Sequence, residues 1–453
     1  MKLKLISIFV LFVCGTHFAY AEDNLSKVKE VRPRVISLAE GIKIVSKDNR
    51  LIKIALPGNE MAYQDSLLAR SALLPQFNAN ISQTFNMFQP AMKFNSSSVN
   101  MADKNALSYG IDVYQTLFDF GKSLSYWKAS NELYKAQKAH TQSVVRVATL
   151  EFTIAYFDLL EAQRMIEVYT KEVESLSAYL SDIQHLYEQG VVVKNDLLPA
   201  KIRLADIKQK LIATRNNRQV ASARLNNILG LSLREVVNVK DIKMAPPKFP
   251  DMQDAWDTAQ ALRPEVTFYN DQINSSVLSQ RAKSVENFPT LFVDLGYSYA
   301  QNQYMVHQDN ASVELGAKMN LYDGGVSRAN LLKERFYQKK LTEQKDKIVE
   351  DIKLEIEDSY FGLKNACEKV AVATDALAQA QENVRFYRVK YQAGSATPSE
   401  VLDAITMQTK AQTNYYNDDY ELKRTYAKLM YSIGIDLGLI YERMESEKNG
   451  TAN

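Results

Sequence analysis

Glycine, proline, histidine and cysteine are all scarce in this chain, which has 16 Gly, 11 Pro, 4 His and 2 Cys among 453 residues. Few glycines and prolines favour long uninterrupted helices over a loop-rich fold. Two cysteines exclude a scaffold held together by many disulfides. No charge of one sign dominates, because 55 Lys and Arg nearly balance 53 Asp and Glu. The net charge therefore gives no reason to expect nucleic acid as a partner.

Residues that could carry catalysis are few and scattered. His140, His185 and His307 lie in unrelated segments, and Cys367 has no evident histidine partner. Neither a metal cluster nor a nucleophile with its base can be assembled from them. Phosphate-binding P-loop and GxGxxG patterns are both missing. We therefore predict no metal, no cofactor and no enzymatic activity.

The first residues, MKLKLISIFVLFVCGTHFAYA, combine a Lys-bearing start, an apolar centre and a small-residue ending. This pattern predicts a secretory signal peptide over residues 1–21, cut after Ala21. Lipid modification at Cys14 is the alternative, which the bulky Val13 before it disfavours. No later segment has about 18 uncharged apolar residues, so any membrane insertion must use strands.

The chain repeats itself at a shift of 204 residues. The segment QTLFDFG at 115–121 matches MNLYDGG at 319–325, and further matches follow without insertion. Each of these segments joins an alternating stretch to a long helical one, through Asp119 and Gly121 in the first copy and Asp323 and Gly325 in the second. We expect a first structural repeat over 22–250, a second over 251–436 and a polar C-terminal tail over 437–453. Prolines at 243–251 mark the seam.

Strict alternation of apolar and polar residues predicts one β-hairpin in each repeat, at about 77–118 and 291–322. The Asn- and Ser-rich segment 88–106 between the first two strands predicts a loop. Each strand has about the 9–11 residues of a tilted transmembrane strand, although a soluble sandwich alternates in the same way. Four strands cannot close a barrel in lipid, so the chain must oligomerise. Two copies would form a barrel filled by side chains, and three copies would form a barrel with a lumen.

Long helices follow the strands, from Lys122 to about Tyr187 and from Val326 to about Tyr391. Apolar residues recur along both with the a and d spacing of a heptad, which is typical of a coiled-coil seam. The first seam contains Leu159, Ala162, Ile166, Tyr169, Val173, Leu176, Leu180, Ile183 and Tyr187, and the second Leu363, Ala366, Val370, Ala373, Leu377, Ala380, Val384, Tyr387 and Tyr391. Helical hairpins are predicted at about 122–229 and 326–434. A soluble coiled-coil rod would explain the heptads but not the strands.

Turns with a glycine end the long helices, in YEQGVVVKNDLLPA at 187–200 and YQAGSATPSEVLDA at 391–404. Gly190 and Gly394 suit the left-handed residue after a helix end, and we expect Asn195 and Ser399 to cap the next helices. The acidic residues nearby have two interpretations. They can compensate the dipole at a helix start, or they can line an opening.

These motifs, in this order from about 37 to 436, resemble the TolC-type outer-membrane efflux proteins. The resemblance implies a mainly α homotrimer with a twelve-stranded transmembrane β-barrel, four strands per chain, continued by a long α-helical coiled-coil barrel. It implies a channel in the outer membrane of a Gram-negative-type bacterium, in contact with outer-membrane lipid and with a large periplasmic part. Its expected partners are a periplasmic adaptor protein and an inner-membrane transporter of the resistance-nodulation-division or ABC type. Such channels pass small molecules or secreted proteins to the exterior.

Family residues carry over by position. The resemblance implies a periplasmic gate at Asp196, Tyr391, Glu400 and Asp403, and adaptor contacts at Gly190, Val191, Gly394 and Ser395. One departure is that Ala396 occupies the position of a gate arginine, and neighbouring Lys194 is a candidate to replace it. The alternative function is a periplasmic coiled-coil rod or adaptor protein without a membrane barrel.

Overall fold

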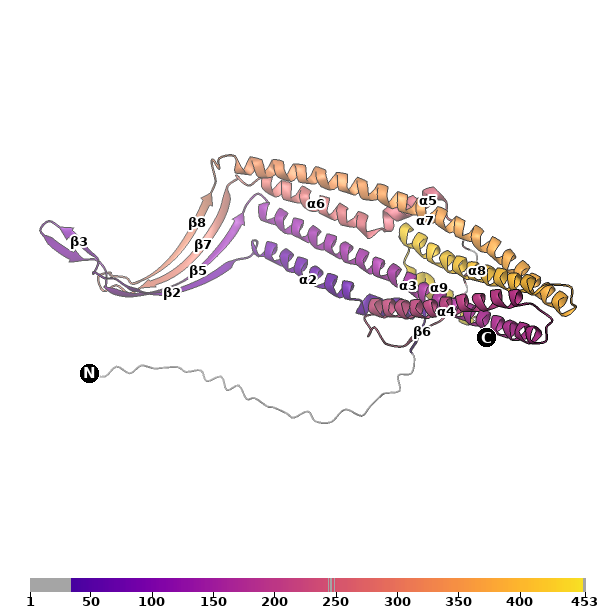
Figure 1. The fold of residues 1–453 in the computed structure, drawn as a ribbon. Helices are drawn as coiled ribbons and strands as arrows, with labels where there is room; N and C mark the ends of the chain where they lie inside the picture. Colours follow the sequence, from indigo (N-terminus) through magenta and orange to yellow (C-terminus); the bar gives the residue numbers. More distant parts are fainter. Residues whose placement is uncertain (1–33, 243, 245–246, 248, 451–453) are drawn as a thin grey trace, which may run out of the picture.

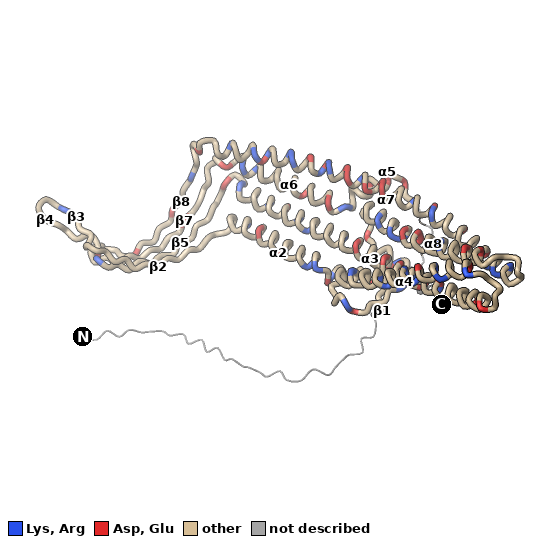
Figure 2. Tube along the Cα trace, viewed as in Figure 1, with Lys and Arg blue, Asp and Glu red and all other residues tan. Residues whose placement is uncertain are grey.

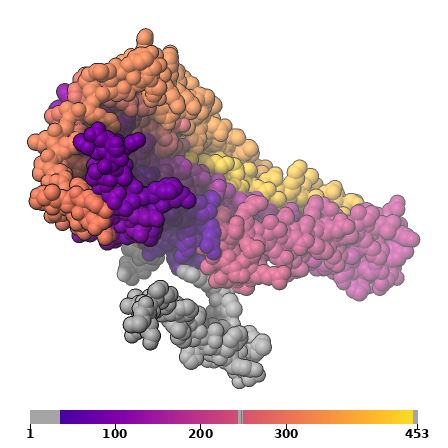
Figure 3. Space-filling view, turned by 90° about the vertical axis from the view of Figure 1, so that its left-hand side faces the viewer, coloured from indigo at the N-terminus to yellow at the C-terminus, as the bar shows by residue number. Residues whose placement is uncertain are grey.

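The computed structural model describes residues 34–242, 244, 247 and 249–450. The predicted signal peptide and Cys14 lie outside these residues. The molecule is long, with strands at one end and helical hairpins at the other (Figure 1). Viewed from the strand end, the chain forms a curved wall (Figure 3). The β-strands and the helical hairpins therefore lie at opposite ends of the long axis.

Four long strands form one antiparallel sheet in the order β2-β5-β7-β8. Its strands are β2 (Gln76–Phe85), β5 (Asn105–Phe118), β7 (Thr290–Ala300) and β8 (Asp309–Lys318). Each repeat supplies one hairpin, and β5 pairs with β7 to join the repeats. β2 and β8 are the edges, with no further strand beside them in the described part of the chain. The prediction of four strands per chain is confirmed.

Two small β-structures were not predicted from the sequence. The segment predicted as a loop contains a hairpin of β3 (Ala91–Phe94) and β4 (Ser97–Asn100). Its two-residue turn includes Asn95 at a φ of 52°, which asparagine tolerates better than most residues. A parallel pair of β1 (Arg34–Ile36) and β6 (Val237–Val239) joins segments about 200 residues apart. Such short strands carry no periodic signal that a sequence pattern could reveal.

The long helices agree with the prediction. α3 (Lys122–Glu188) and α7 (Val326–Gln392) contain 67 residues each, and α4 (Lys194–Leu229) and α8 (Pro398–Ile433) contain 36 each. Every predicted seam residue except Tyr187 is buried or partly buried, as a coiled-coil seam requires. Within the described residues, no helix has both the length and the apolar character needed to cross a membrane.

Shorter helices continue the order of the strands. α1 (Leu38–Asp48) and α2 (Arg50–Ser71) precede β2, and α5 (Met252–Leu262) and α6 (Pro264–Ser284) precede β7. α3 packs against α2 and α6, and α6 packs against α7. The helical order α2-α3-α6-α7 thus repeats the strand order. The wall runs without a break from strands that carry few charged residues into helices rich in them (Figure 2).

The largest apolar core lies near the middle of the molecule, where both repeats meet. Tyr156 and Phe152 of α3 are fully buried there, and Tyr420 of α8 lies in the same core. The final helix α9 (Leu437–Gly450) adds Leu437 and Tyr441 to it. The polar composition of 437–453 predicts only a tail and gives no signal for this packing.

Candidate functional site

Both strand-to-helix joints are built by an aspartate and a glycine. The Asp119 carboxylate accepts hydrogen bonds from the backbone nitrogen of Gly121 (3.1 Å) and from that of the serine two positions later (2.8 Å). The Asp323 carboxylate does the same at Gly325 (2.9 Å) and the following serine (2.8 Å). Both glycines are left-handed, with φ of 80° and 91°. The aspartates thereby satisfy backbone N–H groups that the first helical turn leaves unpaired.

The two joints differ at the residue between aspartate and glycine. Phe120 adopts a φ of 56° where the second repeat has Gly324 at 68°. This conformation is unfavourable for a residue with a β-carbon. The ring of Phe120 lies against Phe118, with 4.8 Å between centroids, and against Phe288, with 5.1 Å. Aromatic packing therefore offsets the backbone cost in the first repeat.

The tips at the far end also match each other. Gly190 and Gly394 are left-handed, with φ of 74° and 73°. The residues after them, Val191 and Ser395, each donate a backbone hydrogen bond of 2.9 Å to a carbonyl of the last helical turn, as in a Schellman motif. No heavy atom lies within 4 Å of a β-carbon built on either glycine. The tips are thus open surfaces, and Val191 is 67% exposed.

The predicted caps Asn195 and Ser399 are wrong. α8 is capped by Thr397, whose hydroxyl accepts a hydrogen bond from the Glu400 nitrogen (3.4 Å), while the Glu400 carboxylate accepts one from the Thr397 nitrogen (2.7 Å). This reciprocal pair is a capping box. At α4 the N-cap is Val193, whose nitrogen donates to the Asp196 carboxylate (3.3 Å). In both helices the acid three residues after the cap marks the start.

Next to the tips, on the side toward the strands, an apolar cluster joins the four long helices α3, α4, α7 and α8. Tyr391 is partly buried against this cluster. The buried members of the cluster are Leu176, Tyr179 and Ile183 of α3, Leu197, Ala200, Leu204 and Ile207 of α4, Val384 of α7, and Val401, Ala404 and Ile405 of α8. The two helical hairpins are therefore joined at this end of the chain by side chains from both repeats.

The four expected gate residues lie in this region but do not bond to one another. The Tyr391 hydroxyl is buried and has no hydrogen-bond partner in the described chain. Burial raises the pKa of Tyr391, and the charges of Asp182 and Asp196 add to the rise. Glu400 is exposed, and its hydrogen bonds with Thr397 lower the pKa of its carboxyl. Asp403 is exposed as well.

Neither Ala396 nor Lys194 forms an ion pair that could hold the gate closed within one described chain. Ala396 has no polar side chain, and Lys194 is exposed and makes no ion pair among the residues that the structure describes. A role for Lys194 in place of the arginine therefore requires a neighbouring copy.

Tyr179 is a further site residue, which was not predicted from the sequence. Its hydroxyl donates to the carbonyl oxygen of Pro398 at the start of α8, and its ring lies 6.4 Å from that of Tyr391 between centroids. Tyr179 thus connects α3 of the first repeat to the tip of the second. It lies outside the predicted a and d positions, so the heptad pattern gave no signal for it.

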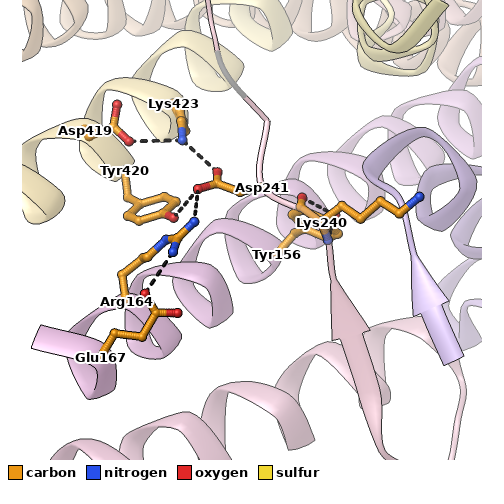
Figure 4. Close-up of polar contacts among 8 residues, drawn as sticks. All are labelled: Tyr156, Arg164, Glu167, Lys240, Asp241, Asp419, Tyr420 and Lys423. Atoms are coloured by element: carbon orange, nitrogen blue, oxygen red, sulfur yellow. Dashed lines mark hydrogen bonds and ion pairs between the residues drawn. The ribbon is translucent and has the colours of Figure 1, made fainter. Parts of the chain in front are cut away.

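A charged network at the core near the middle of the molecule was also not predicted from the sequence (Figure 4). The Asp241 carboxylate accepts from the Tyr420 hydroxyl (2.9 Å), from Lys423 Nζ (3.0 Å) and from an Arg164 guanidinium nitrogen (3.2 Å). Burial would raise the pKa of Asp241, but Lys423, Tyr420 and Arg164 together outweigh it, so the pKa is lowered. The network ties α3 and α8 to the segment between the repeats.

The described residues contain no group of three or more His, Cys, Asp or Glu arranged to hold a metal ion. His140 lies on α3 beside Phe268, and His185 lies near the end of the same helix. Cys367 is partly buried on α7. The structure therefore brings none of the reactive residues together.

Comparison with known proteins gives matches over most of the chain. The model of a family described as "Outer membrane efflux protein" matches residues 59–231 and 259–435, one segment in each repeat. The outer membrane protein TolC of Salmonella enteritidis is 22% identical over 427 residues, covering 88% of this chain and 83% of that protein. TolC of Vibrio cholerae is 22% identical over 459 residues, covering 95% of each.

Solved structures share the fold at lower identity. The outer-membrane channel OprN superposes with a TM-score of 0.76 at 17% identity, covering 88% of this chain and 90% of that one. The CmeC outer membrane channel of Campylobacter jejuni gives a TM-score of 0.77 at 13% identity, covering 90% and 89%. The two-repeat organisation and the four strands per chain are thus those of known channel structures.

Proposed function

Because the chain belongs to the outer membrane efflux protein family, we propose that three copies of this outer-membrane channel form one continuous export duct. Its helical part lies in the periplasm of a Gram-negative bacterium. It is a transport channel and not an enzyme, and the alternative of a periplasmic rod or adaptor is set aside by a family match in both repeats. The trimer, its gate and its partners form the proposal argued below.

The observation that carries the proposal is the pair of open sheet edges. β2 and β8 each present a row of backbone groups with no partner strand in the described chain. Lipid provides no hydrogen bonds for such groups, so every edge must be paired. Two copies would close eight strands around side chains, whereas three copies of four strands leave room for a lumen. A lumen is what an export channel needs.

The tips supply the surface for a periplasmic adaptor. The turns that follow α3 and α7 lie at the end of the molecule farthest from the strands (Figure 1), and the space around Gly190 and Gly394 in these turns is open. Two such tips per chain give a trimer six similar positions in a ring. We propose that an adaptor binds this ring and connects the duct to an inner-membrane transporter, of the resistance-nodulation-division or ABC type. The exported substrate is then selected by the transporter.

The same end of the duct holds the gate. Glu400 and Asp403 are exposed near the start of α8, so threefold symmetry would gather six carboxylates around the periplasmic opening. Like charges in a constriction concentrate cations. Tyr391 and Asp196 lie close enough for the aspartate to affect the tyrosine pKa, and we propose that they help to hold the helices closed.

Assembly is the direct test. The protein extracted from membranes in mild detergent should have the mass of three chains, and it should form discrete conducting pores in planar bilayers. Its migration in gel electrophoresis should change on heating, because a closed barrel resists detergent until it unfolds. A folded monomer that inserts and conducts alone would contradict the proposal.

A further inference from the structure

Two apolar clusters divide the helical part of the chain into an upper unit, near the middle of the molecule, and a lower unit, next to the tips. The upper cluster includes Leu160 of α3, Leu225 of α4 and Tyr420 of α8. The lower cluster begins again at Leu176 of α3 and Ile207 of α4. Between them lies a recess of about 410 Å³ that is open to the surface and has a largely polar lining, which includes Asp158, Glu161, Tyr169, Asn217, Thr413 and Asn417. This recess lies beside buried apolar residues of the same section, Met165 and Val168 of α3.

Glu172 lies at the lower margin of this section, one helical turn above Leu176. Its side chain is only 1% exposed. One carboxylate oxygen accepts from an Arg203 guanidinium nitrogen on α4 (3.1 Å). The other oxygen, and Nε of Arg203, are buried and make no hydrogen bond to the described residues. The pair therefore joins a buried, incompletely bonded carboxylate on α3 to a guanidinium on α4 whose side chain is 23% exposed.

A third helix covers the pair. Thr409 of α8 is buried, and its side chain, together with Arg203 and Lys210, opposes the rise in the pKa of Glu172 that burial causes. Asp206, on α4, pairs with both Arg203 (3.2 Å) and Lys210 (3.1 Å). Glu172 is therefore enclosed by one helical hairpin and by the return helix of the other. Separating the hairpins would expose it to water.

Burial of a charged group such as the Glu172 carboxylate costs hydration that attraction to its partner does not always restore. The cost is greater when polar atoms remain unbonded, as they do at Glu172 and Arg203. The apolar cluster immediately below favours the closed arrangement of the hairpins. The ion pair favours the separated arrangement instead, because its charged groups become hydrated when the hairpins separate.

We propose that the Glu172–Arg203 pair is a built-in conformational device that lowers the cost of separating the two helical hairpins at the periplasmic end. This inference rests on the proposed function, in which that end opens and closes. The polar-lined recess next to the pair separates it from the upper cluster. The pair thereby keeps the closed state from being too stable to open.

The test is a double-mutant cycle on the mature trimer in detergent. Hydrogen exchange of the backbone amides in 197–207 and 401–409 reports local separation of the hairpins. An apolar pair, Glu172→Leu with Arg203→Met, should slow this exchange about tenfold, because buried ion pairs are often less stable than apolar replacements. Arg203→Met alone should speed the exchange, since it leaves the buried carboxylate without its cation.

The matched control is the exposed pair of Glu382 and Arg385 on α7, whose nearest N–O distance is 2.6 Å. Changing both to Leu and Met should leave exchange in the two segments unchanged. Planar-bilayer conductance is measured on the same variants, and the apolar pair at 172 and 203 should lower it.

The two proposals can fail separately. Slower exchange with unchanged conductance supports the role of the ion pair and contradicts a gate at the tips. Unchanged or faster exchange in the apolar variant overturns the inference, as does an Arg203→Met variant that exchanges no faster than the wild type.

Discussion

Thr397 and Glu400 cap each other at the start of α8. The Glu400 carboxylate accepts from both the backbone nitrogen (2.7 Å) and the hydroxyl (2.9 Å) of Thr397. A carboxylate bonded in this way has a structural role that needs no pore. Yet the same hydrogen bonds lower the pKa of Glu400, so they keep it charged. The cap therefore maintains the charge on which the proposed cation filter depends.

The first prediction separates these two roles. Glu400→Gln with Asp403→Asn removes both charges, and the Gln amide can still accept from the Thr397 nitrogen. Cation selectivity and block by divalent cations should fall several-fold in planar bilayers, with little change in thermal stability. Thr397→Ala is the matched control, because it weakens the cap and leaves both charges. Its expected result is lower stability with selectivity retained.

The pH dependence of this block reflects two opposing effects. The hydrogen bonds from Thr397 lower the pKa of Glu400, whereas like charges gathered in the proposed ring favour the protonated form. Block by divalent cations should therefore be present at neutral pH and be lost in acid as the carboxylates become protonated. Block that already disappears at neutral pH would show that other groups bind the cation.

The second prediction concerns the glycines of the tips. Gly394→Val should reduce export strongly and leave the trimer intact. The space around it is open, so the change acts through its left-handed backbone, at a cost of about 1–2 kcal/mol for a residue with a β-carbon. Asparagine tolerates this conformation, so Gly394→Asn should export more than the valine variant. Equal loss in both would mean that adaptor contact, and not backbone geometry, requires glycine.

The third prediction concerns Tyr391. Because its hydroxyl has no partner in the described chain, Tyr391→Phe should not destabilise a single chain. Any increase in resting conductance would then arise from a contact made in the closed trimer, and Asp196→Ala should cause a similar increase. Tyr179→Phe is the comparison, since it loses a hydrogen bond to Pro398 and should cost about 1 kcal/mol in stability. Unchanged conductance in the Tyr391 and Asp196 variants would place the constriction elsewhere.

The fourth prediction concerns the network at Asp241. Asp241→Asn should lower the free energy of unfolding by about 2 kcal/mol, because two cations and a tyrosine lose a charged acceptor. A folded pKa below the unfolded value adds stability that is present above about pH 3.9 and is lost as pH falls through the folded pKa. The variant should lack this acid-dependent loss in thermal unfolding. Asp48→Asn, at an exposed pair with Lys53, should change little.

Much of the fold follows from patterns that are local in sequence. The left-handed glycines at 121 and 190 bound α3 on both sides, and heptads identify its buried face. The capping box of Thr397 and Glu400 was also visible, with Pro398 between them at the first helical position. The prediction of Ser399 as the cap does not fit that pattern, and Val193 carries no polar side chain that could identify it as a cap.

Contacts between distant segments could not be predicted in this way. Asp241 meets Arg164 and Lys423 from helices 77 and 182 residues away. Each of these side chains looks like an ordinary surface charge in the sequence. Glu172 and Arg203 are equally inconspicuous, and nothing in their sequence context shows that the Glu172 side chain is buried. Sequence periodicity locates an interface but not the polar groups that it encloses.

The equal length of α3 and α7, 67 residues each, constrains how this chain can change during evolution. A helix of that length is about 100 Å long, so one added residue moves its tip by about 1.5 Å and rotates it by about 100°. An insertion in α3 alone would therefore leave Gly190 and Gly394 at different depths and would shift one seam out of register. Viable length changes should come in matched pairs, one in each repeat, and in steps close to seven residues.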